Sequence, residues 1–108
     1  MSIIKESDWK IFKKIKENAI SLFCERALEE FDEAINRNKN NPHNRYLLLY
    51  ELVQNRDKQM QLLFDDHSRS KAAIQLIAIR GEKLADESLL SKLSDEFLEA
   101  TDPEKIKW

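Results

Sequence analysis

The sequence predicts an all-α protein, and three observations carry this prediction. The 108 residues include one glycine and two prolines, too few for the positive-φ turns that the hairpins of a β-sandwich or barrel require. Good helix formers such as Lys, Glu and Leu are abundant, and apolar residues recur at intervals of three and four. The length suits a single helical domain over residues 1–108. We expect an irregular four-helix bundle with a long N-terminal helix and an apolar central third helix.

The first predicted helix covers residues 7–37. Ser7 is a candidate cap for its exposed amides, and Asp8 suits the positive end of the helix dipole. One face carries apolar or small residues at helical spacing: Trp9, Phe12, Ala19, Ile20, Phe23, Ala27, Phe31 and Ala34. Other apolar residues widen this face on one flank early and on the other flank later: Ile11, Ile15 and Leu22, then Cys24, Leu28 and Ile35. The two halves of the helix should therefore face different neighbours.

The second predicted helix covers residues 42–64 and follows an asparagine-rich turn. Asn41 is a plausible N-cap, and Pro42 in the first turn loses nothing by its missing N–H. The expected buried face consists of seven residues: Tyr46, Leu49, Tyr50, Val53, Met60, Leu63 and Phe64. Arg56 and Asp57 are the unexpected residues on or beside this face.

The third predicted helix covers residues 70–80 and is apolar nearly all the way round, which is typical of an element at the centre of a domain. A buried strand over residues 74–79 is the alternative, although no second strand candidate exists to pair with it. Gly81 is expected to stop the helix in a left-handed conformation. Before it, residues 65–70 offer several capping groups, so the chain either breaks there or bends.

The fourth predicted helix begins between Asp86 and Ser88. It should bury a set of leucines and a phenylalanine: Leu89, Leu90, Leu93, Phe97 and Leu98. The spacing of Thr101 and Glu104 resembles that of a capping box with a nearby proline. We therefore expect a last helical turn that carries Ile106 and Trp108 and packs back onto the body, and a frayed tail is the alternative.

Composition limits the classes of function. The 18 Lys and Arg against 20 Asp and Glu give a formal charge of −2, which disfavours a dedicated nucleic-acid binder. The single cysteine, Cys24, fits a reducing compartment. Charges at residues 5, 6 and 8 leave no room for the apolar region of a signal peptide, and the longest apolar run is far too short to span a membrane. We expect a cytoplasmic protein.

Two constellations are candidates for a small-ligand site. Arg56 and Asp57, with Arg45 one flank over, suit either an anion pocket or an internal ion-pair network, because a buried charge needs a partner. His67 lies among acidic and hydroxyl residues over 65–71, which are either ligands or the capping groups of a corner. No His has the Glu-x-x-His spacing of helical metal sites, so we expect no metal or other cofactor. No nucleophile, base and orienting group come together, so we expect no enzyme.

Basic residues form a candidate nucleic-acid patch in two groups. The six residues are Lys10, Lys13, Lys14, Arg69, Lys71 and Arg80. Either group is able to contact phosphates, and the alternative is a solvated surface on a chain whose net charge is negative.

The first predicted helix has a charge gradient that opposes its dipole, because it is basic at its start and acidic at its end. The gradient becomes favourable if the helix lies antiparallel to its own symmetry mate. Isologous twofold pairing is also the commonest oligomer. We therefore predict a homodimer through this helix, with another helix of the same chain as the alternative neighbour.

Three functions remain open after these observations. The first is a small protein-protein interaction or assembly module that presents helix faces to a protein partner or to itself. The second is a nucleic-acid-associated regulator that uses the basic patch. The third is a small-ligand or metal-binding protein that uses Arg45, Arg56, Asp57 and His67.

Overall fold

The computed structural model describes residues 4–36 and 41–105. All regular secondary structure in these two segments is helical, so the predicted all-α class is confirmed. The elements are α1 (Glu6–Asn36), α2 (Pro42–Phe64), a 3-10 turn η1 (Arg69–Lys71), α3 (Ala72–Gly81), α4 (Glu87–Leu90) and α5 (Asp95–Ala100).

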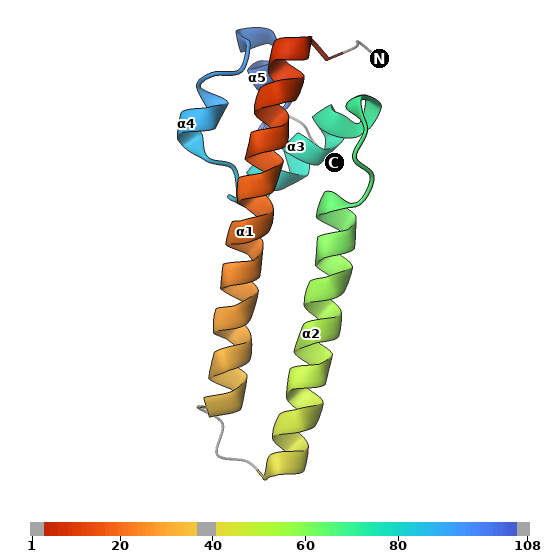
Figure 1. Ribbon diagram of the computed structural model, residues 1–108, viewed down its shortest axis with the longest axis vertical. Helices are drawn as coiled ribbons and strands as arrows, with labels where there is room; N and C mark the ends of the chain where they lie inside the picture. The colour runs from red at the N-terminus through yellow and green to blue at the C-terminus, as the bar shows by residue number, and fades with distance from the viewer. Residues whose placement is uncertain (1–3, 37–40, 106–108) are drawn as a thin grey trace.

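The two long helices form an antiparallel hairpin, and all the short helices gather at one end of it (Figure 1). The molecule measures 53 × 24 × 24 Å. We call the end that carries α3, α4 and α5 the head. It includes α1 up to Phe23 and α2 from Gln59 onward. The remaining part of the hairpin, residues 24–36 of α1 and 41–58 of α2, is called the arm.

The hydrophobic core lies in the head. Its buried residues come from α1, from the end of α2 and from the short helices: Ile4, Trp9, Phe12, Ile15, Ala19, Phe23, Leu63, Phe64, Ala72, Leu76, Ile79, Leu84, Leu90 and Leu93. The cluster ends at Phe23 on α1 and at Leu63 on α2. In the arm only Ala27 and Ala34 are buried, because two helices alone cannot enclose large side chains between them.

The boundaries of the long helices follow the sequence closely. Asn41 caps α2 as predicted, since its side chain accepts a 2.9 Å hydrogen bond from the Asn44 amide. Helix α2 ends at Phe64, also as predicted. Helix α1 begins at Glu6, so Ser7 lies inside its first turn. The predicted end of the first helix at residue 37 lies outside the described residues.

The corner between α2 and α3 breaks the helical path completely. Asp66 has a positive φ of 69°, and the chain re-enters a helix only through η1. The Gln75 side-chain amide, on α3, donates hydrogen bonds to the carbonyl oxygens of Asp65 and Asp66. This contact satisfies two backbone acceptors and fixes the start of α3 against the end of α2. The strand alternative for residues 74–79 is excluded, because this segment is helical.

Helix α3 ends at Gly81, one residue later than predicted, and a Schellman motif follows it. The Leu84 amide donates to the Ile79 carbonyl and the Lys83 amide to the Arg80 carbonyl, both at 3.0 Å. Lys83 is the left-handed residue, with a φ of 58°. The prediction that Gly81 adopts this conformation is wrong, because Gly81 is the last residue of α3 and its φ is not positive.

Replacing Lys83 with glycine should stabilise the fold by about 1 kcal/mol. A left-handed conformation costs a residue with a Cβ roughly 1–2 kcal/mol, and the extra freedom of glycine in the unfolded chain returns part of that gain. Urea unfolding followed by circular dichroism measures the difference. Lys83→Ala is the matched control, since it removes the charge and keeps the Cβ. Equal midpoints for the glycine and alanine variants would contradict this account.

The predicted fourth helix is two short helices, so the described residues contain five α-helices rather than four. Ser94 interrupts the apolar periodicity, since its hydroxyl accepts a 3.2 Å hydrogen bond from the Phe97 amide and caps α5. Thr101 ends α5 instead of starting a helix, because its hydroxyl donates to the Phe97 carbonyl at 2.8 Å. The predicted packing of Ile106 and Trp108 lies outside the described residues.

Candidate functional site

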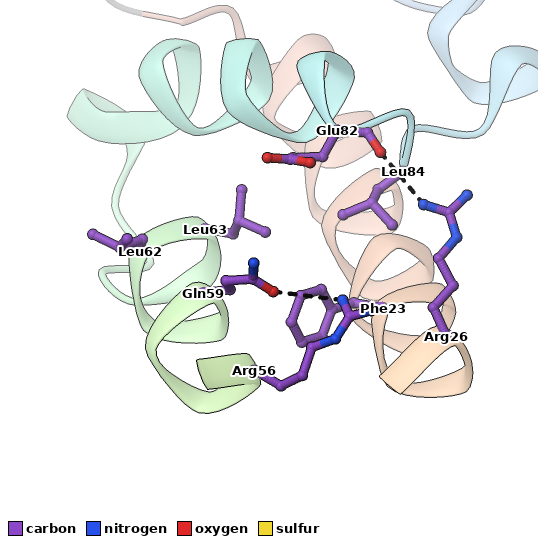
Figure 2. Close-up of a pocket in the computed structure, with 8 residues that line it drawn as sticks. All are labelled: Phe23, Arg26, Arg56, Gln59, Leu62, Leu63, Glu82 and Leu84. Atoms are coloured by element: carbon purple, nitrogen blue, oxygen red, sulfur yellow. Dashed lines mark hydrogen bonds between the residues drawn. The ribbon is translucent and has the colours of Figure 1, made fainter. Parts of the chain in front are cut away.

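A small pocket of about 170 Å³ lies where the arm meets the head. Its apolar lining comes from α1, α2 and the turn after α3, with Phe23 at its centre (Figure 2). The Arg56 guanidinium lies 5.3 Å from the centre of the Phe23 ring. It also forms a 3.2 Å ion pair with Glu30. Arg56 thus takes part in an internal ion pair, which is one of the two arrangements that the sequence suggested.

A second arginine closes the other side of the pocket. Arg26 donates long hydrogen bonds of 3.4 and 3.3 Å to the carbonyl oxygens of Glu82 and Lys83. These acceptors belong to the turn that ends α3, so Arg26 ties this turn to α1 (Figure 2). Both guanidinium groups thus donate hydrogen bonds within the chain, and Arg56 is also paired with a carboxylate.

The four residues predicted to bind a ligand do not come together. Arg45 lies at the far end of the arm, where it donates a 3.0 Å hydrogen bond to the Ile35 carbonyl. Asp57 is exposed beside Arg56 and accepts a 3.2 Å hydrogen bond from Gln61. His67 lies in the head, 5.1 Å from the Trp9 ring. Their partners on α1 span residues 9 to 35, which at 1.5 Å per residue is about 39 Å.

A buried lysine lies in the head. Lys16 is only 5% exposed. Its ammonium donates to the Gln75 side-chain oxygen at 3.2 Å and lies 3.4 Å from His67 Nδ1. Burial lowers the pKa of Lys16, and the nearby Asp66 and Asp65 carboxylates offset part of that effect.

The lowered pKa of Lys16 predicts a specific dependence of stability on pH. The unfolded chain holds the Lys16 proton more tightly than the folded chain does, so the protonated lysine opposes folding at neutral pH. This penalty should fade as the pH rises through the folded pKa and vanish above the ordinary value of 10.5. Stability relative to Lys16→Met, measured by urea unfolding, should therefore increase at alkaline pH. A difference that is constant or decreases up to pH 10.5 would show that Lys16 is not desolvated.

The structure joins part of the predicted basic patch. Lys13 and Arg69 both lie over the Trp9 ring, at 5.8 and 5.5 Å from its centre. The lysines at the start of α1 and the basic residues that begin at Arg69 therefore meet at this ring. Arg69 is also paired with Glu6. The Trp9 ring is itself buried and thus unavailable to stack on a base.

The remaining members of the patch divide into two kinds. Lys10, Lys14 and Lys71 are exposed. Arg80 is committed to the fold, since its guanidinium donates to the Leu98 carbonyl at 2.7 Å and to the Thr101 hydroxyl at 3.0 Å. The basic surface therefore consists mainly of the start of α1, with Arg69 beside it.

Several exposed apolar side chains lie on the arm. Successive helical residues turn by about 100°, so the side chains of the pocket lie on one flank of the hairpin and a second set lies on the opposite flank. We call this second set the apolar flank: Leu28 and Ile35 of α1 with Tyr46, Tyr50 and Val53 of α2. All five are exposed, whereas the neighbouring apolar residues Phe31 of α1 and Leu49 of α2 are half-buried.

Sequence reasoning missed the two features that are most distinctive here. Lys16 lies in the same helical phase as Phe12, Ala19 and Phe23, and this spacing was sufficient to predict its burial. The prediction that Tyr46, Tyr50 and Val53 are buried is wrong, because all three are exposed. Their exposure had no signal in the sequence, because periodicity identifies a face but not whether a neighbour covers it.

The chain matches no known protein family, and no curated protein or solved structure is significantly similar to it. The described residues contain no group of three or more His, Cys, Asp or Glu side chains placed to hold a metal ion. Among the helices of residues 4–36 and 41–105, none has the length and apolar content of a membrane span.

Proposed function

We propose that the chain is a cytoplasmic protein-protein interaction or assembly module that docks through the apolar flank of the arm. The observation that supports this proposal is exposure. The five side chains have exposed fractions of 64% (Leu28), 45% (Ile35), 66% (Tyr46), 56% (Tyr50) and 44% (Val53). Exposed apolar side chains that gather on one side of a protein are typical of interaction sites.

The arm has the form expected of a docking element. It extends from the head (Figure 1). None of its large side chains belongs to the buried core of the described residues. Two tyrosines on one flank supply broad amphipathic contact area, which is the composition favoured at binding hot spots. We assign no catalytic step to this surface.

The test places a photo-reactive phenylalanine analogue at Tyr50, with a matched control at Lys58 on the outer face of α2. Crosslinking in cells that make the protein should give discrete adducts from position 50 and none from position 58. The absence of any adduct from position 50, whether with the chain itself or with another protein, would overturn the proposed function. Equal adducts from both positions would indicate random collision and would overturn it as well.

A second candidate is a nucleic-acid-associated regulator, and the meeting of Lys13 and Arg69 at Trp9 is the observation in its favour. The Glu6 carboxylate beside Arg69 and the net charge of −2 weigh against it. A gel shift that is lost as salt rises, and lost in a Lys10→Glu/Lys14→Glu variant, would support this candidate. Lack of binding at low salt would remove it.

A further inference from the structure

We infer that the partner on the apolar flank is a second copy of this chain, with the two α1 helices packed antiparallel about a twofold axis near Ser21. This inference rests on the proposed function, because it names the occupant of the same flank. It follows from three features of α1: an uncovered heptad stripe, a division of charge along that stripe, and the length of the stripe.

One side of α1 is exposed or half-buried from the head to the end of the arm in the part of the chain that the structure describes. In Figure 1, α1 passes in front of α3 and α5. Residues on this side alternate in spacing between four and three: Lys10, Lys14, Glu17, Ser21, Cys24, Leu28, Phe31 and Ile35. Every one of them is exposed or half-buried. This spacing places the eight residues along one stripe of α1, and the second half of the stripe, from Cys24 to Ile35, carries the apolar residues of a coiled-coil seam.

The seam is charged in one half and apolar in the other. Lys10 and Lys14 form its basic half, which belongs to the head, whereas Leu28 and Ile35 form its apolar half on the arm. Exposed acidic residues, Glu29 and Asp32, border the apolar half. The lysines lie about 22–33 Å from these acidic residues along the helix. They are thus too far apart to pair within one chain at physiological ionic strength.

An antiparallel second copy joins these complementary halves. With the axis near Ser21, Lys10 lies opposite Asp32 of the second copy, and Lys14 lies opposite Leu28 and Glu29. The lysine stems cover the apolar residues while their ammonium groups reach the acidic border. Glu17 opposes Glu25 in this arrangement, which weakens it slightly. A parallel copy would instead place like charges together, so the charges favour the antiparallel orientation.

The dimensions predict a weak dimer in which α2 takes part. The stripe from Lys10 to Ile35 is about 38 Å long and one helix wide, or roughly 400 Å² per copy. A standard interface covers about 800 Å² per partner. The tyrosines and the valine of the apolar flank on α2 must supply part of the difference. We therefore expect a dissociation constant on the order of micromolar.

The experiment uses two charge-reversed chains, Lys10→Glu/Lys14→Glu and Glu29→Lys/Asp32→Lys. Sedimentation velocity should show a wild-type dimer at about 100 μM in low salt that dissociates as salt is added. Each reversed chain alone should dimerise at least about tenfold more weakly, because every cross-pair becomes like-charged. A mixture of the two should form a heterodimer, since a twofold antiparallel arrangement restores all the pairs at once.

The control variant is Glu51→Lys/Lys58→Glu, which changes the same types of charge on the outer surface of α2. It should dimerise like the wild type, and circular dichroism should show that all three variants are folded. A wild type that is monomeric at about 500 μM in low salt overturns the second-copy inference. So does a mixture that fails to form the heterodimer. If position 50 nevertheless crosslinks to another protein, the proposed function stands and only this inference fails.

Discussion

Replacing Asp8 with alanine should lower the free energy of unfolding by about 3 kcal/mol, because a buried carboxylate then no longer holds the start of α5. Asp8 is 2% exposed. One of its oxygens accepts a 2.8 Å hydrogen bond from the Ser94 amide and the other a 2.7 Å bond from the Ser94 hydroxyl. Without Asp8, the half-buried Ser94 amide loses this acceptor, and the loss of the hydrogen bond is the larger part of the cost.

A double-mutant cycle with Ser94→Ala isolates the contact between Asp8 and Ser94. The Ser94 hydroxyl also caps α5 through the Phe97 amide, so the single serine variant should cost about 1–2 kcal/mol. The double variant should cost clearly less than the sum of the two single variants, because they share one network. Urea unfolding measures all four chains. Additive effects, or an Asp8→Ala chain within about 0.5 kcal/mol of the wild type, would show that this contact does not hold the head together.

The contact between Asp8 and Ser94 also shows where sequence reasoning stops. Asp8 was correctly placed at the positive end of the first helix, which is a local property. Its partner lies 86 residues away, and no periodicity connects positions at that separation. Ser94 itself did have a local signal, because a serine followed by Asp95 and Glu96 is typical of a helix start. The prediction followed the apolar spacing from Leu89 to Phe97 and did not use that signal.

The elements were predictable, but their environments were only partly so. The ends of α2 followed from Asn41 and Phe64, and the apolar face of α1 followed from its spacing. The left-handed residue after α3 was not predictable from glycine preference, because the packing of Leu84 into the core sets where the chain turns. For the candidate surface, the flank shift at Leu28 and Ile35 was visible in the sequence. Whether the same chain covers that flank depends on tertiary packing.

Removing an aromatic ring should have opposite consequences in the head and in the arm. Phe12 is fully buried and stacks on Trp9, with ring centres 5.8 Å apart. Phe12→Ala should cost about 3–5 kcal/mol, since it creates a cavity in the only large core of the described residues. Tyr50 is exposed on the arm, so Tyr50→Ala should change the stability of the monomer by less than about 0.5 kcal/mol. Urea unfolding of dilute protein measures both.

Association should reverse this order, and the comparison separates stability from docking. Tyr50→Ala removes an aromatic anchor from the apolar flank, so it should weaken self-association about tenfold or more while the chain stays folded. Sedimentation at several concentrations measures that loss. Tyr50→Phe keeps the ring and should retain most of the affinity, which distinguishes apolar contact from a hydroxyl contact. If Tyr50→Ala instead destabilised the monomer as much as Phe12→Ala, the tyrosine would belong to the core, and the exposed flank would have no need of a partner.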